Sequence, residues 1–251
     1  MRKIYLLPAL VGLLTSVAAG PLAAQGAVPK QKAAPAPRAA AAGAAPAAAA
    51  GAPVAAATET PIAGADDKTA KAIDGFRSAK FGMNEADVRA AMIKDFSAKP
   101  DAIRAQDNAS ELTHSILMSV PELLPNGGTA ELSYVFGYKS KSLIQIGAVW
   151  SKGTDTAMTP EKLFSNANIL RAHFMGEGFK PDSIAVNMPV AGGIVMFRGS
   201  DAKDRSVILL LQGTFENKEN NQRVLTPTSL LLFYVADAKS PDIFKLPPGQ
   251  F

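Results

Sequence analysis

The side chains that most often do chemistry in proteins are few in this sequence. It has two histidines, His114 and His173, and no cysteine. Neither histidine has a partner at metal-ligand spacing, and without cysteine there is no thiolate site and no cysteine nucleophile. His173 is expected near the carboxyl end of a helix, where a cation is favourable, and His114 in an alternating strand. Both positions favour structural roles over metal binding or catalysis.

Other catalytic motifs are missing as well. No serine lies in the Gly-x-Ser-x-Gly elbow of hydrolases, and the glycine pairs at 127–128 and 192–193 lack the residues of a phosphate loop. The acidic pairs at 66–67 and at Asp201 and Asp204 are expected in linker or loops as solvated charge, because calcium needs denser oxygen ligands. The sequence therefore predicts a protein that is not an enzyme and that uses no metal or other cofactor.

Binding is the chemistry that remains, and three aromatic residues are its candidates: Tyr134, Tyr138 and Trp150. Exposed together, they would form a recognition patch, because aromatic side chains carry a large share of interface energy. The alternative for Trp150, which ends an expected strand, is that it fills the edge of the core. The Pro-rich tail at residues 241–251 is either packed through its apolar residues or presented to a partner as a peptide.

The first 24 residues predict a cleavable export signal. A cationic start at residues 1–3 precedes an apolar stretch at 4–18 and small residues at 17–19 and 22–24, an order typical of secretory signals. The apolar stretch is shorter than the ~20 residues of a spanning helix. We therefore expect a periplasmic, exported protein that contacts the membrane only if the signal stays uncleaved.

Residues 25–66 predict a disordered tether. They are mostly Ala, Pro, Gly and Val, and six prolines between residues 29 and 61 interrupt every helical window. The signal and the tether also hold much of the excess positive charge, so the rest of the chain is close to neutral. It lacks the clustered cations of a nucleic-acid-binding surface, and we expect no nucleic-acid partner.

Residues 67–240 are expected to form one α+β domain. Asn84 is a good N-cap and Pro100 blocks continuation, so a first helix is predicted over residues 85–96. A second helix is predicted to start at Thr159 and Pro160 and to end at Gly176 or Gly178. Strands are predicted at residues 110–118, 130–136 and 143–150 after the first helix, and at 193–198, 206–215 and 229–235 after the second.

The same order of elements thus occurs twice. The two helix starts lie about 75 residues apart, and three predicted strands follow each helix. We therefore predict a tandem repeat of one helix plus three strands, over residues 76–152 and 153–236. Two such units can pack their helices on one face of a shared, mainly antiparallel sheet.

One short segment carries a family resemblance. Residues 81–88 read Phe-Gly-Met-Asn-Glu-Ala-Asp-Val, which resembles the opening of the outer-membrane-assembly lipoprotein and beta-lactamase inhibitor protein families. The resemblance implies a helical segment on an antiparallel sheet, duplicated in the second family, and an envelope protein that binds other proteins. The chain departs from both families because it has no lipobox cysteine and no cysteine pairs. No functional residue is carried over.

These expectations give one leading function. It is a non-enzymatic periplasmic module that binds another envelope protein, as an assembly factor or inhibitor, through its sheet face or the Tyr138 hairpin. The alternative is a carrier of a small apolar ligand, or an unrecognised hydrolase, with its site in the cleft between helices and sheet.

Overall fold

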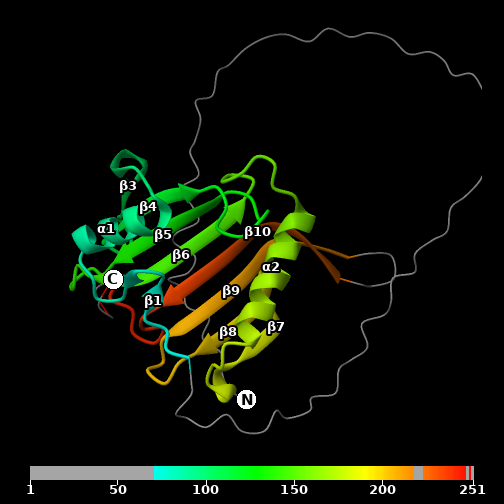
Figure 1. The fold of residues 1–251 in the computed structure, drawn as a ribbon. Helices are drawn as coiled ribbons and strands as arrows, with labels where there is room; N and C mark the ends of the chain where they lie inside the picture. The colour runs from blue at the N-terminus through cyan, green and yellow to red at the C-terminus, as the bar shows by residue number, and fades with distance from the viewer. Residues whose placement is uncertain (1–70, 218–222, 247–248, 250–251) are drawn as a thin grey trace, which may run out of the picture. The chain divides into compact units, whose positions relative to one another are not determined.

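The computed structural model describes residues 71–217, 223–246 and 249. They form an α+β fold in which two helices pack on an eight-stranded antiparallel sheet (Figure 1). This confirms the fold class and the mainly antiparallel sheet predicted from the sequence. The expected signal at residues 1–24 and the tether at 25–66 lie outside the described residues.

The described chain begins with a small hairpin and a helix, followed by the first half of the sheet. The elements are β1 (Gly75–Phe76), β2 (Ala79–Lys80), α1 (Glu85–Phe96), the short 3-10 helix η3 (Pro100–Ala102), β3 (Arg104–Asn108), β4 (Thr113–Val120), β5 (Ala130–Phe136) and β6 (Leu143–Ser151). A second helix then leads into the other half. Its elements are α2 (Pro160–Met175), the 3-10 helix η4 (Pro181–Ser183), β7 (Ala185–Val190), β8 (Gly193–Ser200), β9 (Ser206–Asn217) and β10 (Arg223–Val235).

Each half of the sheet is a run of antiparallel neighbours, and the two runs meet at their last strands. The order is β3-β4-β5-β6-β10-β9-β8-β7, with Leu230 of β10 opposite Trp150 of β6. The helix α2 lies across β10, β9 and β8 (Figure 1). The other helix, α1, contacts the first half, where Glu85 lies 3.3 Å from His114 of β4.

The prediction of three strands after each helix was wrong, because four strands follow each one. The missed strands are β3 and β7, which form the two edges of the sheet. In β3 the sequence is polar and the strand is largely exposed, so no apolar alternation marks it. In β7 the chain contains Pro189, which is unfavourable inside a sheet and tolerated at an edge.

The predicted helix starts and the first helix's bounds are confirmed. The Asn84 side chain accepts a hydrogen bond from the Asp87 amide at 3.0 Å, and Thr159 accepts one from the Lys162 amide at 3.2 Å. These caps satisfy amides that have no partner inside the helix. The second helix ends at Met175, with Gly176 as its cap.

Most of the core lies between the helices and the sheet, and a second apolar cluster lies on the sheet's other face. Alternate residues of β10 separate the two, since Leu230 and Leu232 belong to the first cluster and Leu231 and Phe233 to the second. The second cluster consists of Val195, Ile208, Leu210, Leu231, Phe233 and Val235. Neither helix contributes a residue to it. The central strands are thus apolar on both faces.

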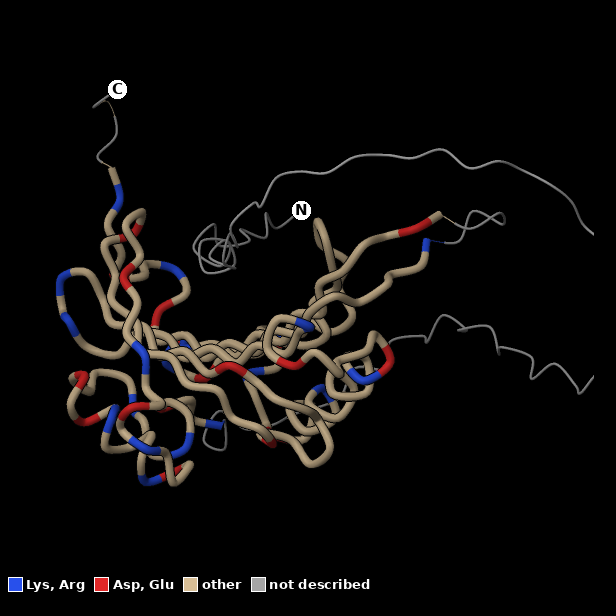
Figure 2. Tube along the Cα trace, turned by 90° about the horizontal axis from the view of Figure 1, so that it is seen from above, with Lys and Arg blue, Asp and Glu red and all other residues tan. Residues whose placement is uncertain are grey.

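Charged residues lie mostly outside the central strands, with both signs interspersed (Figure 2). In the described ranges, neither helix has the length and hydrophobicity that a membrane span requires.

The expectation that Asp201 is solvated loop charge was wrong. Asp201 is 1% exposed, and its carboxylate accepts a 3.0 Å hydrogen bond from the Ile73 amide and a 2.7 Å bond from Arg205 Nε. Arg205 also reaches Asp74 at 2.7 Å. This buried network joins the start of the described chain to the β8–β9 turn. Asp204 agrees with the expectation of a solvated loop charge, because its side chain is 52% exposed and pairs with Lys239.

Candidate functional site

The structure separates the three aromatic candidates. Tyr134 and Trp150 are fully buried, so neither side chain belongs to an exposed recognition patch. Trp150 instead fills the core, as the alternative interpretation predicted. Neither the Tyr134 hydroxyl nor Trp150 Nε1 has a hydrogen-bond partner among the described residues. Burial raises the pKa of Tyr134, so this phenol is neutral at physiological pH.

Tyr138 is the candidate that reaches the surface. It is half-buried in the hairpin between β5 and β6, and its ring lies edge-on to the ring of Phe244 with 5.6 Å between centroids. The Lys141 ammonium lies 5.5 Å from the Tyr138 ring centroid. The Tyr138 amide also donates a 2.8 Å hydrogen bond to the carbonyl of Asp242. The hairpin and the segment after β10 therefore form one surface.

The Asp242 side chain fixes this contact. Its carboxylate accepts hydrogen bonds from the amides of Lys139 at 3.0 Å and Ser140 at 2.8 Å. Hydrogen bonds from the hydroxyl and amide of Ser140 lower the pKa of Asp242, so it stays ionised. A side chain at Gly137 would collide with this carboxylate, so the close approach requires glycine there.

A bulge in β6 lies beside this contact. Val135 pairs with Gln145 and Phe136 with Leu143, which leaves Ile144 as an extra residue in β6. The Ile144 carbonyl accepts a 2.9 Å hydrogen bond from the Ala236 amide, just after β10 ends. Bulges commonly redirect side chains at the end of a sheet. Here the bulge forms part of a pocket.

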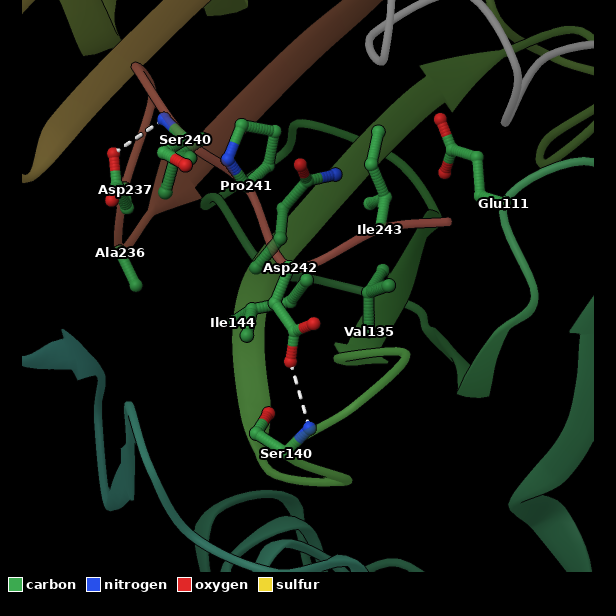
Figure 3. A pocket seen from close by; sticks show the side chains of 12 residues that line it. Glu111, Val135, Ser140, Ile144, Ala236, Asp237, Ser240, Pro241, Asp242 and Ile243 are labelled. Carbon is green, nitrogen blue, oxygen red and sulfur yellow. Dashed lines mark hydrogen bonds between the residues drawn. The ribbon is translucent and has the colours of Figure 1, made fainter. Parts of the chain in front are cut away.

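The pocket lies between the sheet and the segment at residues 236–243 and has a volume of about 240 Å³. Three stretches far apart in the sequence line it. The lining residues are Glu111, Val135, Ser140, Ile144, Gln145, Val235, Ala236, Asp237, Ser240, Pro241, Asp242 and Ile243 (Figure 3). Aliphatic side chains and three carboxylates dominate this lining, which suits a ligand that is partly apolar and partly cationic.

The three carboxylates differ in their surroundings. Those of Asp242 and Asp237 are each held by backbone amides, as Asp237 accepts from Lys239 at 2.9 Å and from Ser240 at 2.8 Å. Glu111 lies across Ile243 from these two (Figure 3). In the described chain its carboxylate accepts one hydrogen bond, from Asn108 Nδ2 at 3.2 Å, and forms no ion pair. Burial raises the pKa of Glu111.

The two histidines lie away from this pocket. His114 Nδ1 is 2.6 Å from Asp107, and its ring packs against Phe136. His173 Nε2 is 3.5 Å from Glu177, near the end of α2 as predicted. The described residues contain no group of three or more His, Cys, Asp or Glu that could hold a metal ion.

Sequence reasoning missed most of the pocket. The sequence pattern places Glu111 only in a predicted alternating strand, and Asp242 only in a Pro-rich tail. In that tail, Phe244 is half-buried against Tyr138, whereas Leu246 is 59% exposed. The run of turn-forming residues around Asp242 was the available signal, but a contact across about 100 residues leaves no local pattern.

The fold and the pocket define an α+β protein with a small surface site at one end of an antiparallel sheet. Comparison with known protein families, with curated proteins and with solved structures finds no match. The function is therefore argued from the site itself.

Proposed function

We propose that the protein is an exported, non-enzymatic module that binds another envelope protein at the end of the sheet formed by the Tyr138 hairpin, the segment after β10 and the pocket. The observation that carries this proposal is the pocket beside a half-buried aromatic pair, Tyr138 and Phe244. Aromatic residues next to a small pocket are a common arrangement at protein interfaces, where a partner side chain is inserted and its neighbours exclude water.

The size of the pocket favours a partner's side chain over a large ligand. Its volume of about 240 Å³ lies below the range of roughly 300–1,000 Å³ that is usual for small-molecule sites. One long side chain fits such a space, whereas a lipid does not. The periplasmic location remains part of the proposal and rests on the sequence of residues 1–24.

Site-specific crosslinking tests this function. A photoreactive phenylalanine analogue is placed at Tyr138, and the protein is irradiated in envelope extract. A matched control carries the analogue at Phe164, which is 52% exposed on α2. We expect one discrete crosslinked protein, identified by mass spectrometry, from position 138 and not from 164. Equal labelling from both positions, or no discrete product from 138, would contradict the proposal.

The same pocket supports a second candidate, a carrier of a small ligand. Native mass spectrometry of the purified protein separates the two functions. A stoichiometric small molecule, lost when Val235→Trp fills the pocket, would favour the carrier. A ligand-free mass together with the discrete crosslink at position 138 would favour protein binding.

We also propose that the two halves arose as a tandem repeat, now of one helix plus four strands. Residues 99–103 read Lys-Pro-Asp-Ala-Ile, and residues 180–184 read Lys-Pro-Asp-Ser-Ile. Both segments form a 3-10 helix after the main helix and before the edge strand. In each, the isoleucine amide donates to the proline carbonyl, at 3.2 Å and 3.3 Å. The sheet order, which is symmetric about β6 and β10, supports the same interpretation.

A chain built from the second half alone tests the repeat. Two copies of residues 153–237 are joined in tandem, so that β10 of each copy can pair with the other. If the halves are equivalent, this chain is expected to melt cooperatively with the circular dichroism of an α+β protein. A chain that stays unfolded, under conditions where the natural protein folds, would count against the repeat.

A further inference from the structure

Among the described residues, Glu111 is the pocket acid whose carboxylate has neither an ion pair nor a hydrogen bond from a backbone amide. Asp242 is held by two amides and lies close enough to Lys139 for that charge to lower its pKa further. Asp237 is held by the two amides of its own turn. In the described part of the chain, the Glu111 carboxylate has a single partner, the neutral side-chain amide of Asn108, and a partly buried carboxylate without a cation is unfavourable. A ligand cation would remove this cost.

The rest of the lining specifies the body of the ligand. Val135 and Val235 are buried on the sheet, and Ile144, Ala236 and Ile243 add further aliphatic surface. Such a surface suits an unbranched alkyl chain. A chain that ends in an ammonium group would contact both the aliphatic lining and the Glu111 carboxylate. Lysine side chains can bury their methylene groups against apolar surface while the ammonium group stays in a polar environment. Here the Glu111 carboxylate would provide that environment.

We propose that the pocket binds a lysine side chain of the partner, with the ammonium group at Glu111 and the methylene chain against Val135 and Val235. The proposal rests on the protein-binding function above and names the group that is recognised. Lysine fits better than arginine, because Asn108 already occupies one oxygen of Glu111. A planar guanidinium binds best to two free carboxylate oxygens, whereas an ammonium needs only one.

The test uses the full chain and two small probes, followed by amide NMR shifts. The probes are N-acetyl-lysine methylamide and N-acetyl-norleucine methylamide, which differ in the ammonium group. We expect saturable shifts at Gln145 and Val235 with the lysine probe, and binding at least 10-fold weaker with norleucine. Glu111→Gln should weaken lysine binding at least 10-fold. The control Glu122→Gln, which removes the same charge at an exposed site outside the pocket, should not change it.

Several results would overturn the proposal. These are equal binding of both probes, an unchanged affinity in Glu111→Gln, shifts scattered over surface acids, or no saturation at all. If Glu111→Gln disturbs the fold, salt provides the second measurement, since raised ionic strength should weaken the lysine probe and leave norleucine unchanged. A failed probe with a successful crosslink at position 138 would reject lysine recognition and leave the protein-binding function standing.

Discussion

At the scale of single residues, Asp201 shows how a buried charge is kept. Its carboxylate meets the amides of Ile73, Lys203 and Arg205 as well as the Arg205 guanidinium. Burial alone would raise the pKa of Asp201, but these hydrogen bonds outweigh it, with the Ile73 amide the largest of them, and the pKa is lowered. Because Ile73 precedes the first strand, this one side chain anchors the entry of the chain into the domain.

Removing this carboxylate should be costly. Asp201→Ala leaves the mostly buried Arg205 without its main partner and orphans the Ile73 amide, so we expect a loss of roughly 3–5 kcal/mol in the free energy of unfolding. Asp204→Ala, three residues away, breaks only the exposed pair with Lys239 and should change the free energy of unfolding far less than Asp201→Ala. Urea unfolding of both variants checks this. A similar cost for the two would mean that burial of Asp201 does not matter.

The stabilisation by Asp201 should depend on pH in a defined direction. Its pKa is lowered in the folded state, so the unfolded chain takes up the proton first as the pH falls. The contribution is therefore complete above the unfolded value of about 3.9 and is lost as the pH falls through the lower folded value. The stability difference between the natural protein and Asp201→Ala should be constant from pH 7 to 5 and shrink below pH 4.

Lysine binding at Glu111 should also depend on pH, with a transition at higher pH than that of the Asp201 contribution to stability. Lysine binding needs the ionised carboxylate, and burial raises the pKa of Glu111 above its usual 4.5. Of the other two acids in the lining, Asp242 has a lowered pKa and stays charged at that pH. The affinity for N-acetyl-lysine methylamide should therefore fall on acidification with a midpoint above pH 4.5. A midpoint below 4.5 would assign the contact to another carboxylate.

At the scale of elements, the two helices differ in how deeply their terminal aromatic residues are buried against the rest of the fold. Phe174 of α2 is 3% exposed and stacks on Phe197 of β8 with 5.5 Å between centroids. Phe96, the last residue of α1, is only half-buried, and the Arg77 guanidinium lies 4.4 Å from its ring centroid. Both rings lie in the last turn of their helices, but they differ in how much apolar surface they remove from water.

The cost of deleting these rings should differ accordingly. Phe174→Ala removes a fully buried aromatic and should lower the free energy of unfolding by roughly 3–5 kcal/mol. Phe96→Ala should cost about 1–2 kcal/mol, because the ring is already partly exposed to water and one cation–π contact is lost. Thermal and urea unfolding measure both. Equal costs would show that α1 is anchored as firmly as α2.

Sequence patterns predicted the elements that obey local rules. The bounds of α1 follow from the Asn84 cap, and those of β5 from alternation between two turns. The strands β3 and β7 were missed because an edge strand needs no apolar face. The pocket was missed because it depends on a bulge at Ile144 and on the return of the chain at Asp242, and neither is encoded within a short window. Tyr138 was found because a surface aromatic in a polar hairpin is itself a local signal.

At the scale of the whole molecule, the pairing of β6 with β10 makes one folding unit of the two halves. Leu230 and Leu232 of β10 belong to the same core as Trp150 and Ile146 of β6. Neither half can lose its structure without exposing this central pair of strands. Stability is therefore a property of the complete sheet.

A pair of substitutions, one in each half, tests this unity. Met92 of α1 is fully buried, and Met92→Ala should cost roughly 2–5 kcal/mol. Together with Phe174→Ala it should shift the same single transition to lower temperature, with coincident near- and far-ultraviolet circular dichroism. Two steps, each moved by only one substitution, would indicate independent halves.

The central place of β10 also governs the order of events when the chain folds. Leu230 pairs with Trp150, 80 residues earlier, so the middle of the sheet closes only after nearly the whole domain has emerged. Contacts over such separations form slowly, because a long loop loses its freedom before any pairing is gained. Until then β6 and β9 both keep open, strongly apolar edges, the kind of edge that associates with other chains. A chain truncated before residue 223, which lacks β10, should therefore aggregate and should not form a stable folded half.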